Sequence, residues 1–471
     1  MKNQFVLYLI IALSITSTGL SQDGEIHHNL ENDSANHVSN IKEIFNKGQV
    51  EGHMRNYFMA TINEGSLTDY WANAVGGSLG YHTAQWKGFQ LGVKGIFTFN
   101  LASSDLNKID PVAQRSAHWE KELFDVTRPE EKTDLDRLEE LYIKYNFKSS
   151  AITFGKMYIN KGPLLLKRDG RMKPFVYKGL WISFKELKKQ QLYGGWIYAV
   201  SPRGMTEWFS LNEAIGLSNN GYLPDGEHAE YHEHSNTKGL LALGYENELS
   251  KNLKLMVWDY YLHHMYNINW FQLDFENKKL FAGIQYVHQF ADAYQEKLNF
   301  ENRIYQPDEK GNVISTQFGL KTKNQNARFS AAYLHSFNKG RFIFPQELTR
   351  ENFYVSQPRS FADGFGAVDI YMLRAQFAPD RGKYKGLSSD IRVERVQVNS
   401  ELDYSLNKYG KSSYYQSTLV GTYSFQNKLS GLHLSILYAH RFLENSAHLH
   451  GSEKFYKTNF HHINLIINIH F

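Results

Sequence analysis

The sequence predicts an all-β protein, a transmembrane antiparallel β-barrel of about 18 strands. Three observations predict it: a last segment with one apolar face, many short segments that alternate in the same way, and connections that are by turns short and long. In the last segment, residues 463–471, the apolar face holds Leu465, Ile467, Ile469 and Phe471, and the polar face holds Asn464, Asn468 and His470. With nothing after it, we expect this strand to pair backwards with a first strand near residues 54–62. An open sheet edge would leave backbone groups unpaired in hydrocarbon.

Alternating segments follow one another from Met54 to the end of the chain. The clearest spans residues 89–99, with apolar side chains at Phe89, Leu91, Val93, Phe97 and Phe99. The same alternation recurs in residues 141–147, 180–185, 314–321 and 432–436. A period of two over roughly ten residues is typical of a tilted membrane strand.

The connections between these segments alternate in length. Tight turns are expected near 148–149, 188, 250–251, 326 and 426–428. Longer connections are expected at 101–134, 159–173, 202–236, 292–311, 338–365 and 443–457. Outer-membrane barrels place short turns in the periplasm and long loops outside, whereas a soluble β-sandwich has no reason to alternate so regularly. A barrel of this strand number also leaves an aqueous bore.

The first residues have the form of a secretory signal peptide. Lys2 precedes an apolar run from Phe5 to Ile15, and small residues follow it. The run is too short for a spanning helix, which needs about 20 residues. We therefore expect a signal peptide at 1–21, a loosely ordered polar periplasmic leader at 22–50, and the barrel domain at 51–471.

The composition fits an exported barrel. Aromatic residues make up 15% of the chain, which suits the aromatic girdles at the two membrane interfaces. A mean hydropathy of −0.49 excludes a helical membrane protein but not a barrel, in which only every second residue meets lipid. The net charge of +4 comes from nearly balanced acids and bases, so no nucleic-acid partner is expected. The chain has no Cys, and no cofactor or metal is required by any motif.

A wide bore needs a constriction, and the connection at 159–173 is the candidate for a loop folded inwards. It holds five basic residues and one acidic residue, namely Lys161, Lys167, Arg168, Arg171 and Lys173 against Asp169. Three consecutive leucines, residues 164–166, would be costly on an exposed loop but pack well against the inner wall. The alternative is an ordinary surface loop that is basic by chance or that binds lipopolysaccharide phosphates.

Mid-strand charges are expected to point into the lumen, because a cation on the lipid face near the midplane costs about 2–4 kcal/mol. Alternation predicts inward side chains for Lys94, Lys144, Lys178, Lys185, Lys321, Arg328 and Arg392, with the facing of Lys178 uncertain beside Gly179. Rows of Lys and Arg favour anions in a narrow pore. Asp390 and Glu394 flank Arg392, so an acidic wall opposite the basic one is also expected. The alternative is that these charges only solvate the lumen.

The chain resembles a known family at this point. Gly155-Lys156, Pro163, Asp169, Arg171, Pro174, Phe175 and Gly179 resemble the signature core of OprD-type outer-membrane porins, and residues 72–77, 385–387 and 429–432 are similar to other parts of it. The resemblance implies an 18-stranded barrel in the outer membrane of a Gram-negative bacterium. It implies passive diffusion of small hydrophilic solutes, with basic side chains guiding carboxylate-bearing ones.

The residues, taken together with the resemblance, predict a set of substrate-channel positions. They are Lys94, Lys144, Lys156, Lys161, Lys167, Arg168, Asp169, Arg171, Lys178, Lys185 and Arg392. The expected partners are small solutes, outer-membrane lipid and lipopolysaccharide, and the protein is expected to be a monomer or weak trimer. Phe471 resembles the terminal aromatic residue by which the barrel-assembly machinery recognises its clients.

Other functions stay open at this stage. A channel for apolar or aromatic compounds would have an apolar lumen, and an energy-coupled importer would need a plug domain before the barrel. A barrel enzyme would need a nucleophile system, and the adjacent His335 and Ser336 point to opposite faces of their strand. The His- and Glu-rich stretch at 227–234 has metal-compatible side chains at close spacing, although a solvated outer loop is the simpler interpretation.

Overall fold

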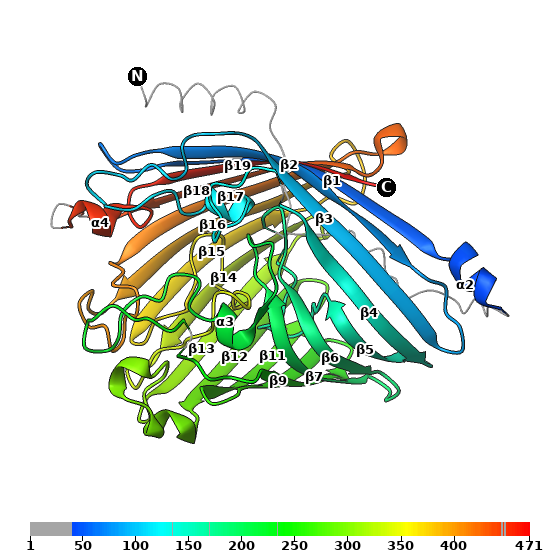
Figure 1. Ribbon diagram of the computed structural model, residues 1–471, viewed down its shortest axis with the longest axis horizontal. Coiled ribbons are helices and arrows are strands. Elements are labelled where there is room, and N and C mark those ends of the chain that lie inside the picture. The colour runs from blue at the N-terminus through cyan, green and yellow to red at the C-terminus, as the bar shows by residue number, and fades with distance from the viewer. Residues whose placement is uncertain (1–39, 134, 169, 233, 444–445, 447–448) are drawn as a thin grey trace.

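The computed structural model describes residues 40–471, except 134, 169, 233, 444–445 and 447–448 (Figure 1). The expected signal peptide and residues 22–39 of the expected leader lie outside the described residues. From residue 49 onward the chain forms a ring of long tilted strands, with loops from one end of the ring packed into its interior (Figure 1).

Nineteen strands form one antiparallel sheet. They are β1 (Gln49–Ile62), β2 (Tyr70–His82), β3 (Phe89–Ser103), β4 (Arg137–Phe147), β5 (Ser150–Met157), β6 (Val176–Phe184), β7 (Gln190–Ser201), β8 (Phe209–Ser210), β9 (Leu240–Ser250), β10 (Leu253–Leu262), β11 (Tyr266–Glu276), β12 (Leu280–Ala291), β13 (Lys310–Lys321), β14 (Ala327–Ser336), β15 (Val368–Phe377), β16 (Leu387–Val398), β17 (Tyr414–Ser424), β18 (Leu432–Phe442) and β19 (His461–His470). The two-residue β8 pairs only with the end of β7, so the closed wall has 18 strands, as predicted.

The last strand closes the barrel against the first. β19 pairs with β1 in a register that runs from His53 opposite His470 to Ile62 opposite His461. One residue beyond β19, Phe471 continues this pairing: its N–H donates to the Gly52 carbonyl at 3.0 Å, and the Gly52 N–H donates to the Phe471 carbonyl at 2.7 Å. The predicted backward pairing of the carboxy-terminal strand is therefore confirmed.

Period-two alternation separates an apolar outer face from a polar inner face. On β19, Leu465, Ile467 and Ile469 are exposed on the outside, whereas His462 and Asn464 are buried on the inside. The predicted outer residues of β3 are likewise exposed, and the predicted tight turns all fall between consecutive strands. The fold class predicted from alternation and connection length is thus confirmed.

Several loops from the long-loop end enter the barrel, and two of them carry Arg171, Arg350 and Arg359. The first is the loop at 158–175, where Leu164 and Leu165 are fully buried against the inner wall. The second, at 337–367, was not predicted to turn inwards. It crosses the interior, because the Tyr177 hydroxyl on β6 donates to the Leu348 carbonyl at 2.8 Å and Gln416 on β17 donates to the Pro358 carbonyl at 2.8 Å.

The described helices are short and lie in the connections. They are α2 (Ile41–Asn46), η2 (Lys121–Leu123), α3 (Leu211–Ala214), η3 (Ala293–Lys297), η4 (Phe300–Asn302), η5 (Asn427–Leu429) and α4 (Gly451–Lys454). In the described part of the chain, none has the length and apolar character needed to cross a bilayer. α2 lies within the expected leader and packs at the short-turn end, where the Ala84 N–H donates to the Ile44 carbonyl at 3.0 Å.

Candidate functional site

The basic loop predicted at 159–173, which spans 158–175 between β5 and β6, runs into the lumen, and its cations contact aromatic and polar groups there. The ammonium groups of Lys161 and Lys167 lie over the rings of Tyr193 and Tyr158, at 5.3 and 4.5 Å from the ring centroids. Arg168 reaches the second inward loop, 337–367, and donates to the carbonyl of Glu351 at 3.1 Å and to the side chain of Asn352 at 3.0 Å. Asp169 lies outside the described residues.

The wall cations on the inner face are largely paired with acids. Lys94 on β3 contacts Glu51 with 2.6 Å between Nζ and Oε1, and Arg392 on β16 contacts Asp390 with 2.5 Å between NH2 and Oδ2. Lys144 alternates with outward residues of β4, and Lys185 belongs to the turn after β6. Lys94 therefore adds little net positive charge to the lumen, whereas Arg392 shares Asp390 with Arg374, so these three residues together keep one positive charge.

Lys156 and Lys178 lie on the outer face of the barrel, opposite to the face that a lumen position requires. They are directly paired across β5 and β6, and Lys156 also pairs with Leu141, whose side chain is exposed on the outside. The outer face is what alternation within each strand gives, because Lys156 lies two residues from the outward Phe154 and Lys178 lies two residues from the outward Leu180.

A cluster of arginines surrounds one carboxylate in the interior. Glu122, in η2 of the loop at 104–136, accepts Arg171 with 2.5 Å between Oε2 and NH2, and Arg203 with 3.1 Å between Oε2 and NH2. Arg359, from the loop at 337–367, interacts electrostatically with the same carboxylate, and Arg350, from the same loop, interacts electrostatically with Arg203. We call Glu122, Arg171, Arg203, Arg350 and Arg359 the arginine cluster.

The arginine cluster carries an excess of buried positive charge. Burial acts to raise the pKa of Glu122, but Arg171 and Arg203 lower it well below its ordinary value, so this carboxylate stays charged. Burial and repulsion from Arg171 lower the pKa of Arg203 to about 9, which leaves it protonated at neutral pH. The Nε atoms of all four arginines have no hydrogen-bond partner among the described residues. The cluster thus offers buried donors and positive potential to an anion.

Backbone groups of the two inward loops fix the arginine cluster to the wall. Arg55 on β1 donates to the carbonyl of Arg171, and the Tyr57 hydroxyl donates to the carbonyl of Gly170 at 3.3 Å. On the opposite side of the β1–β19 seam, the Arg359 guanidinium donates to Nε2 of His462 at 2.5 Å. The cluster is therefore held between loops and the strands at which the barrel closes.

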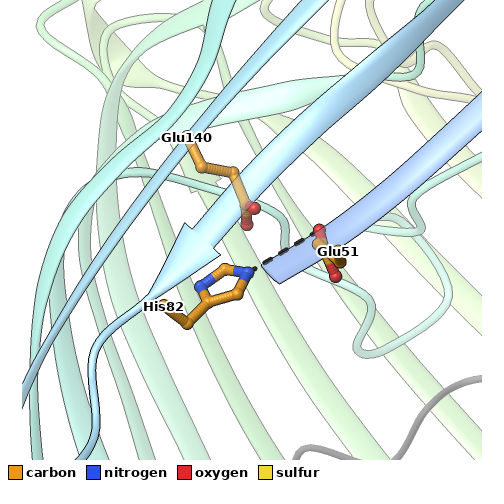
Figure 2. Close-up of side chains that lie close together, drawn as sticks. All are labelled: Glu51, His82 and Glu140. Atoms are coloured by element: carbon orange, nitrogen blue, oxygen red, sulfur yellow. Dashed lines mark ion pairs between the residues drawn. The ribbon is translucent and has the colours of Figure 1, made fainter. Parts of the chain in front are cut away.

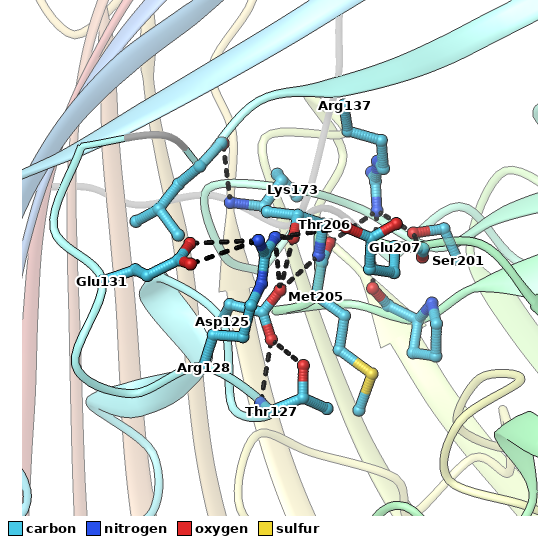
Figure 3. A network of polar contacts seen from close by, with 12 residues as sticks. Asp125, Thr127, Arg128, Glu131, Arg137, Lys173, Ser201, Met205, Thr206 and Glu207 are labelled. Carbon is cyan, nitrogen blue, oxygen red and sulfur yellow. Dashed lines mark hydrogen bonds and ion pairs between the residues drawn. The ribbon is translucent and has the colours of Figure 1, made fainter.

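A second polar network ties three long loops together (Figure 3). Asp125 is fully buried and accepts hydrogen bonds from the backbone N–H and hydroxyl groups of Thr127 and Thr206, at 2.5–2.8 Å. Arg137, at the start of β4, donates to Ser201 Oγ at 2.9 Å and to the Pro174 carbonyl at 2.9 Å. The loops at 104–136, 158–175 and 202–239 are therefore one connected assembly rather than separate segments.

Replacing Arg137 with Ala should loosen this assembly. Arg137 is buried and paired with Glu139, with 2.8 Å between NH2 and Oε1, and removing one partner of a buried pair costs about 3–5 kcal/mol. We expect faster hydrogen–deuterium exchange at 170–175 and 202–207 and noisier open-channel currents. Arg381→Ala, at a residue exposed in a short turn, is the matched control. Unchanged exchange in Arg137→Ala would contradict the role of Arg137 as an anchor.

Lys173 should make thermal stability depend on pH. The side chain is fully buried, and burial together with repulsion from Arg137 lowers its pKa from 10.5 to about 7. Between these two values the unfolded chain binds the proton and the folded chain does not, so stability rises with pH in this window. We expect the unfolding temperature in detergent to rise from pH 7 to 9, and Lys173→Met to reduce the slope. An equal slope in the variant would show that Lys173 keeps its proton.

Two functional alternatives raised by the sequence do not assemble in the described residues. His335 pairs with Asp369, with 2.9 Å between Nδ1 and Oδ1, whereas Ser336 donates to the Phe365 carbonyl, so the His and Ser do not form a pair. The described His and carboxylate groups of 227–234 do not converge on one point. A different group, Glu51, His82 and Glu140, does converge.

Comparison with known proteins identifies the family. The model of the family described as outer membrane porin, OprD family, matches residues 47–358, which is more than half of the chain. The chain belongs to the OprD family. The resemblance predicted from the residues around 155–179 is therefore confirmed, and OprD proteins are outer-membrane channels rather than enzymes. No curated protein matches this sequence.

Solved OprD-type porins share the fold over most of their length. OccAB2 of Acinetobacter baumannii is 15% identical with a TM-score of 0.69, and OccK9 (OpdG) of Pseudomonas aeruginosa is 14% identical with a TM-score of 0.67. OpdK of Pseudomonas aeruginosa, solved with vanillate, is 15% identical with a TM-score of 0.65. Each comparison covers 91% of this chain and 99% of the other. At this level of identity the likeness concerns the fold.

Sequence reasoning missed part of the arginine cluster in this OprD porin. Glu122, Arg203, Arg350 and Arg359 lie in loops without periodicity, and only Arg171 was predicted. A usable signal was present, because Arg203 and Arg359 each follow a proline, a residue that fixes bends in loops.

Proposed function

We propose that this porin passes small hydrophilic solutes by passive diffusion and prefers anionic, carboxylate-bearing ones. The observation that carries the proposal is the arginine cluster, in which Arg171, Arg203 and Arg359 interact with one glutamate inside the barrel and Arg350 adds a fourth positive charge beside Arg203. Groups of basic side chains in a narrow pore favour anions, because they replace the water that the anion sheds.

Carboxylates fit this site better than other small anions. Arg guanidinium presents donors in a fixed fork that matches the two oxygens of a carboxylate. The unpartnered Nε atoms of Arg171, Arg203 and Arg359 are available for such a contact among the described residues. Glu122 holds two of these side chains in place, and a passing carboxylate would relieve the remaining repulsion between them.

A preference for aromatic carboxylates is the second form of the proposal. One of the similar solved porins was obtained with vanillate, which combines an aromatic ring with a carboxylate. In this chain Trp119 lies beside the cluster, with its ring centroid 4.6 Å from Cζ of Arg359. Aromatic faces of this kind favour flat solutes.

Reversal potentials in planar bilayers test the anion preference. In a KCl gradient we expect the wild-type channel to favour Cl⁻, and the double variant Arg171→Gln/Arg203→Gln to shift the reversal potential towards zero. Lys178→Gln is the matched control, because it removes one positive charge from the outer face and should change nothing. A cation-selective wild type, or a double variant with the same reversal potential as the wild type, would contradict the proposal.

Single-channel block separates the two forms of the proposal. Benzoate and succinate should both interrupt the current, and neutral benzamide should not, if the carboxylate is what the cluster binds. Stronger block by benzoate than by succinate would support the aromatic form. Block by benzamide equal to block by benzoate would instead point to a channel for aromatic compounds without regard to charge.

A further inference from the structure

Three potential metal ligands meet on the inner wall at the short-turn end of the barrel. Glu51 lies on β1, His82 ends β2, and Glu140 lies on β4, with Lys94 on the intervening strand β3. The register brings them together, because Gly80 pairs with both Glu51 and Lys94, and Lys94 pairs in turn with Glu140. In Figure 2 the Glu140 carboxylate and the His82 ring point toward the same space beside Glu51.

The geometry of these three side chains suits a single cation. Their ligand atoms all lie within 4.8 Å of one another, and His82 Nε2 is 3.6 Å from Glu51 Oε1. Zinc bonds of about 2.0–2.2 Å to nitrogen and oxygen place tetrahedral ligands about 3.3 Å apart. The observed separations are therefore close to those of a bound site and need only small side-chain rotations.

Two of the three ligand side chains are almost fully buried. His82 is 3% exposed, and its Nε2 has no hydrogen-bond partner. Glu140 is 7% exposed, and the positively charged or ionisable groups that act on its carboxylate include Lys94 and His82. Burial of a carboxylate is costly, and a cation between Glu140 and His82 would neutralise the first and bind the unbonded Nε2 of the second.

The neighbours of His82 resemble those of a metal-binding histidine. Its Nδ1 lies 3.0 Å from the hydroxyl of Tyr142, which leaves Nε2 as the nitrogen that faces the carboxylates. Metal-ligating histidines commonly have their second ring nitrogen held in this way. Room for the site comes from glycines, because a Cβ at Gly92 would lie 2.4 Å from the Tyr142 ring and one at Gly80 would lie 3.0 Å from Glu51 Cγ.

We propose that Glu51, His82 and Glu140 form a binding site for a divalent transition metal, with Zn²⁺ as the expected ion, on the lumen wall of this porin. One imidazole and two carboxylates favour Zn²⁺ over Mg²⁺ and Ca²⁺, which prefer oxygen ligands alone. Lys94 competes with the metal, because its Nζ lies 2.6 Å from Glu51 Oε1. The site does not depend on the anion preference proposed above, because it lies on β1, β2 and β4 rather than in the arginine cluster.

Calorimetric titration with ZnCl₂ tests the site in the full chain, purified in detergent and stripped of metal with EDTA. We expect one Zn²⁺ per barrel, with His82→Ala and Glu140→Gln each weakening binding at least about tenfold. The triple variant His228→Ala/His232→Ala/His234→Ala is the matched control and should bind like the wild type. Heat-modifiable mobility on gels confirms that each variant is a folded barrel.

Lys94→Met should change the Zn²⁺ affinity in the opposite direction to the two ligand variants, which distinguishes this site from binding at the surface. Removing the competing charge should tighten Zn²⁺ binding about tenfold, because the cation no longer displaces an ammonium group from Glu51. Loss of binding in the triple histidine variant would move the site to the outer loop and overturn the proposal. So would the absence of binding in both the wild type and Lys94→Met, or equal affinities of His82→Ala and the wild type.

Discussion

Deletion of Phe471 is expected to lower the yield of folded barrel about tenfold or more. The backbone of Phe471 makes two hydrogen bonds with Gly52, each worth about 1 kcal/mol, and its ring lies over the same glycine. The terminal aromatic residue is also the group by which we expect the assembly machinery to recognise the chain. The measurement is the amount of heat-modifiable barrel in outer-membrane fractions. Barrels that do assemble should have the conductance of the wild type.

Two further variants separate recognition from packing. Phe471→Tyr keeps an aromatic end and should restore assembly. Gly52→Leu keeps Phe471 but displaces its ring, since a Cβ at Gly52 would lie 2.1 Å from a ring carbon. We expect Gly52→Leu to lower thermal stability while leaving most of the yield intact. A normal yield after deletion of Phe471 would show that the last residue is dispensable.

Replacement of residues 338–366 by a short Gly-Ser turn is expected to raise single-channel conductance several-fold. The exchange is feasible, because Ser336 and Val368 are paired neighbours at the ends of β14 and β15. It removes the segment that crosses the interior, so that the bore approaches that of an open 18-stranded wall. It also removes Arg350 and Arg359, so the anion preference should fall at the same time.

The matched control for the loop replacement lies at the short-turn end of the barrel. The turn between β15 and β16 is exposed, with the Arg381 side chain 79% exposed, and shortening it should leave conductance unchanged. A loop-replaced barrel that folds but conducts like the wild type would mean that 337–367 does not limit the pore. The limiting segment would then be the loop at 158–175.

The barrel was predictable because the need for apolar side chains on its outer face produces a local alternation in the sequence. One residue in two must be apolar where strands meet lipid, and this pattern gave the pairing of β19 with β1 and the outward face of Phe89, Leu91 and Val93. The alternation of short and long connections gave the end at which loops enter. Neither inference required contacts between residues far apart in sequence.

The interior was harder to predict, because long-range packing decides it. The loop at 158–175 was recognisable from its leucines and basic residues, but nothing periodic marks the crossing loop at 337–367 or the position of Arg203 beside Glu122. Lys156 and Lys178 were expected in the lumen, but they share the outer face with Phe154 and Leu180, each two residues away on the same strand.

Burial of the basic loop limits which parts of this channel are accessible from outside the cell. The stretch at 161–173 is rich in the residues that trypsin cleaves, yet Arg171 and Lys173 are 2% and 0% exposed and lie inside the barrel. Proteases, antibodies and phages reach the rim and outer loops, and they cannot bind or cleave a segment enclosed by 18 strands. The outer loops are consequently open to attack from outside, while the buried part of the stretch at 161–173 is shielded from it.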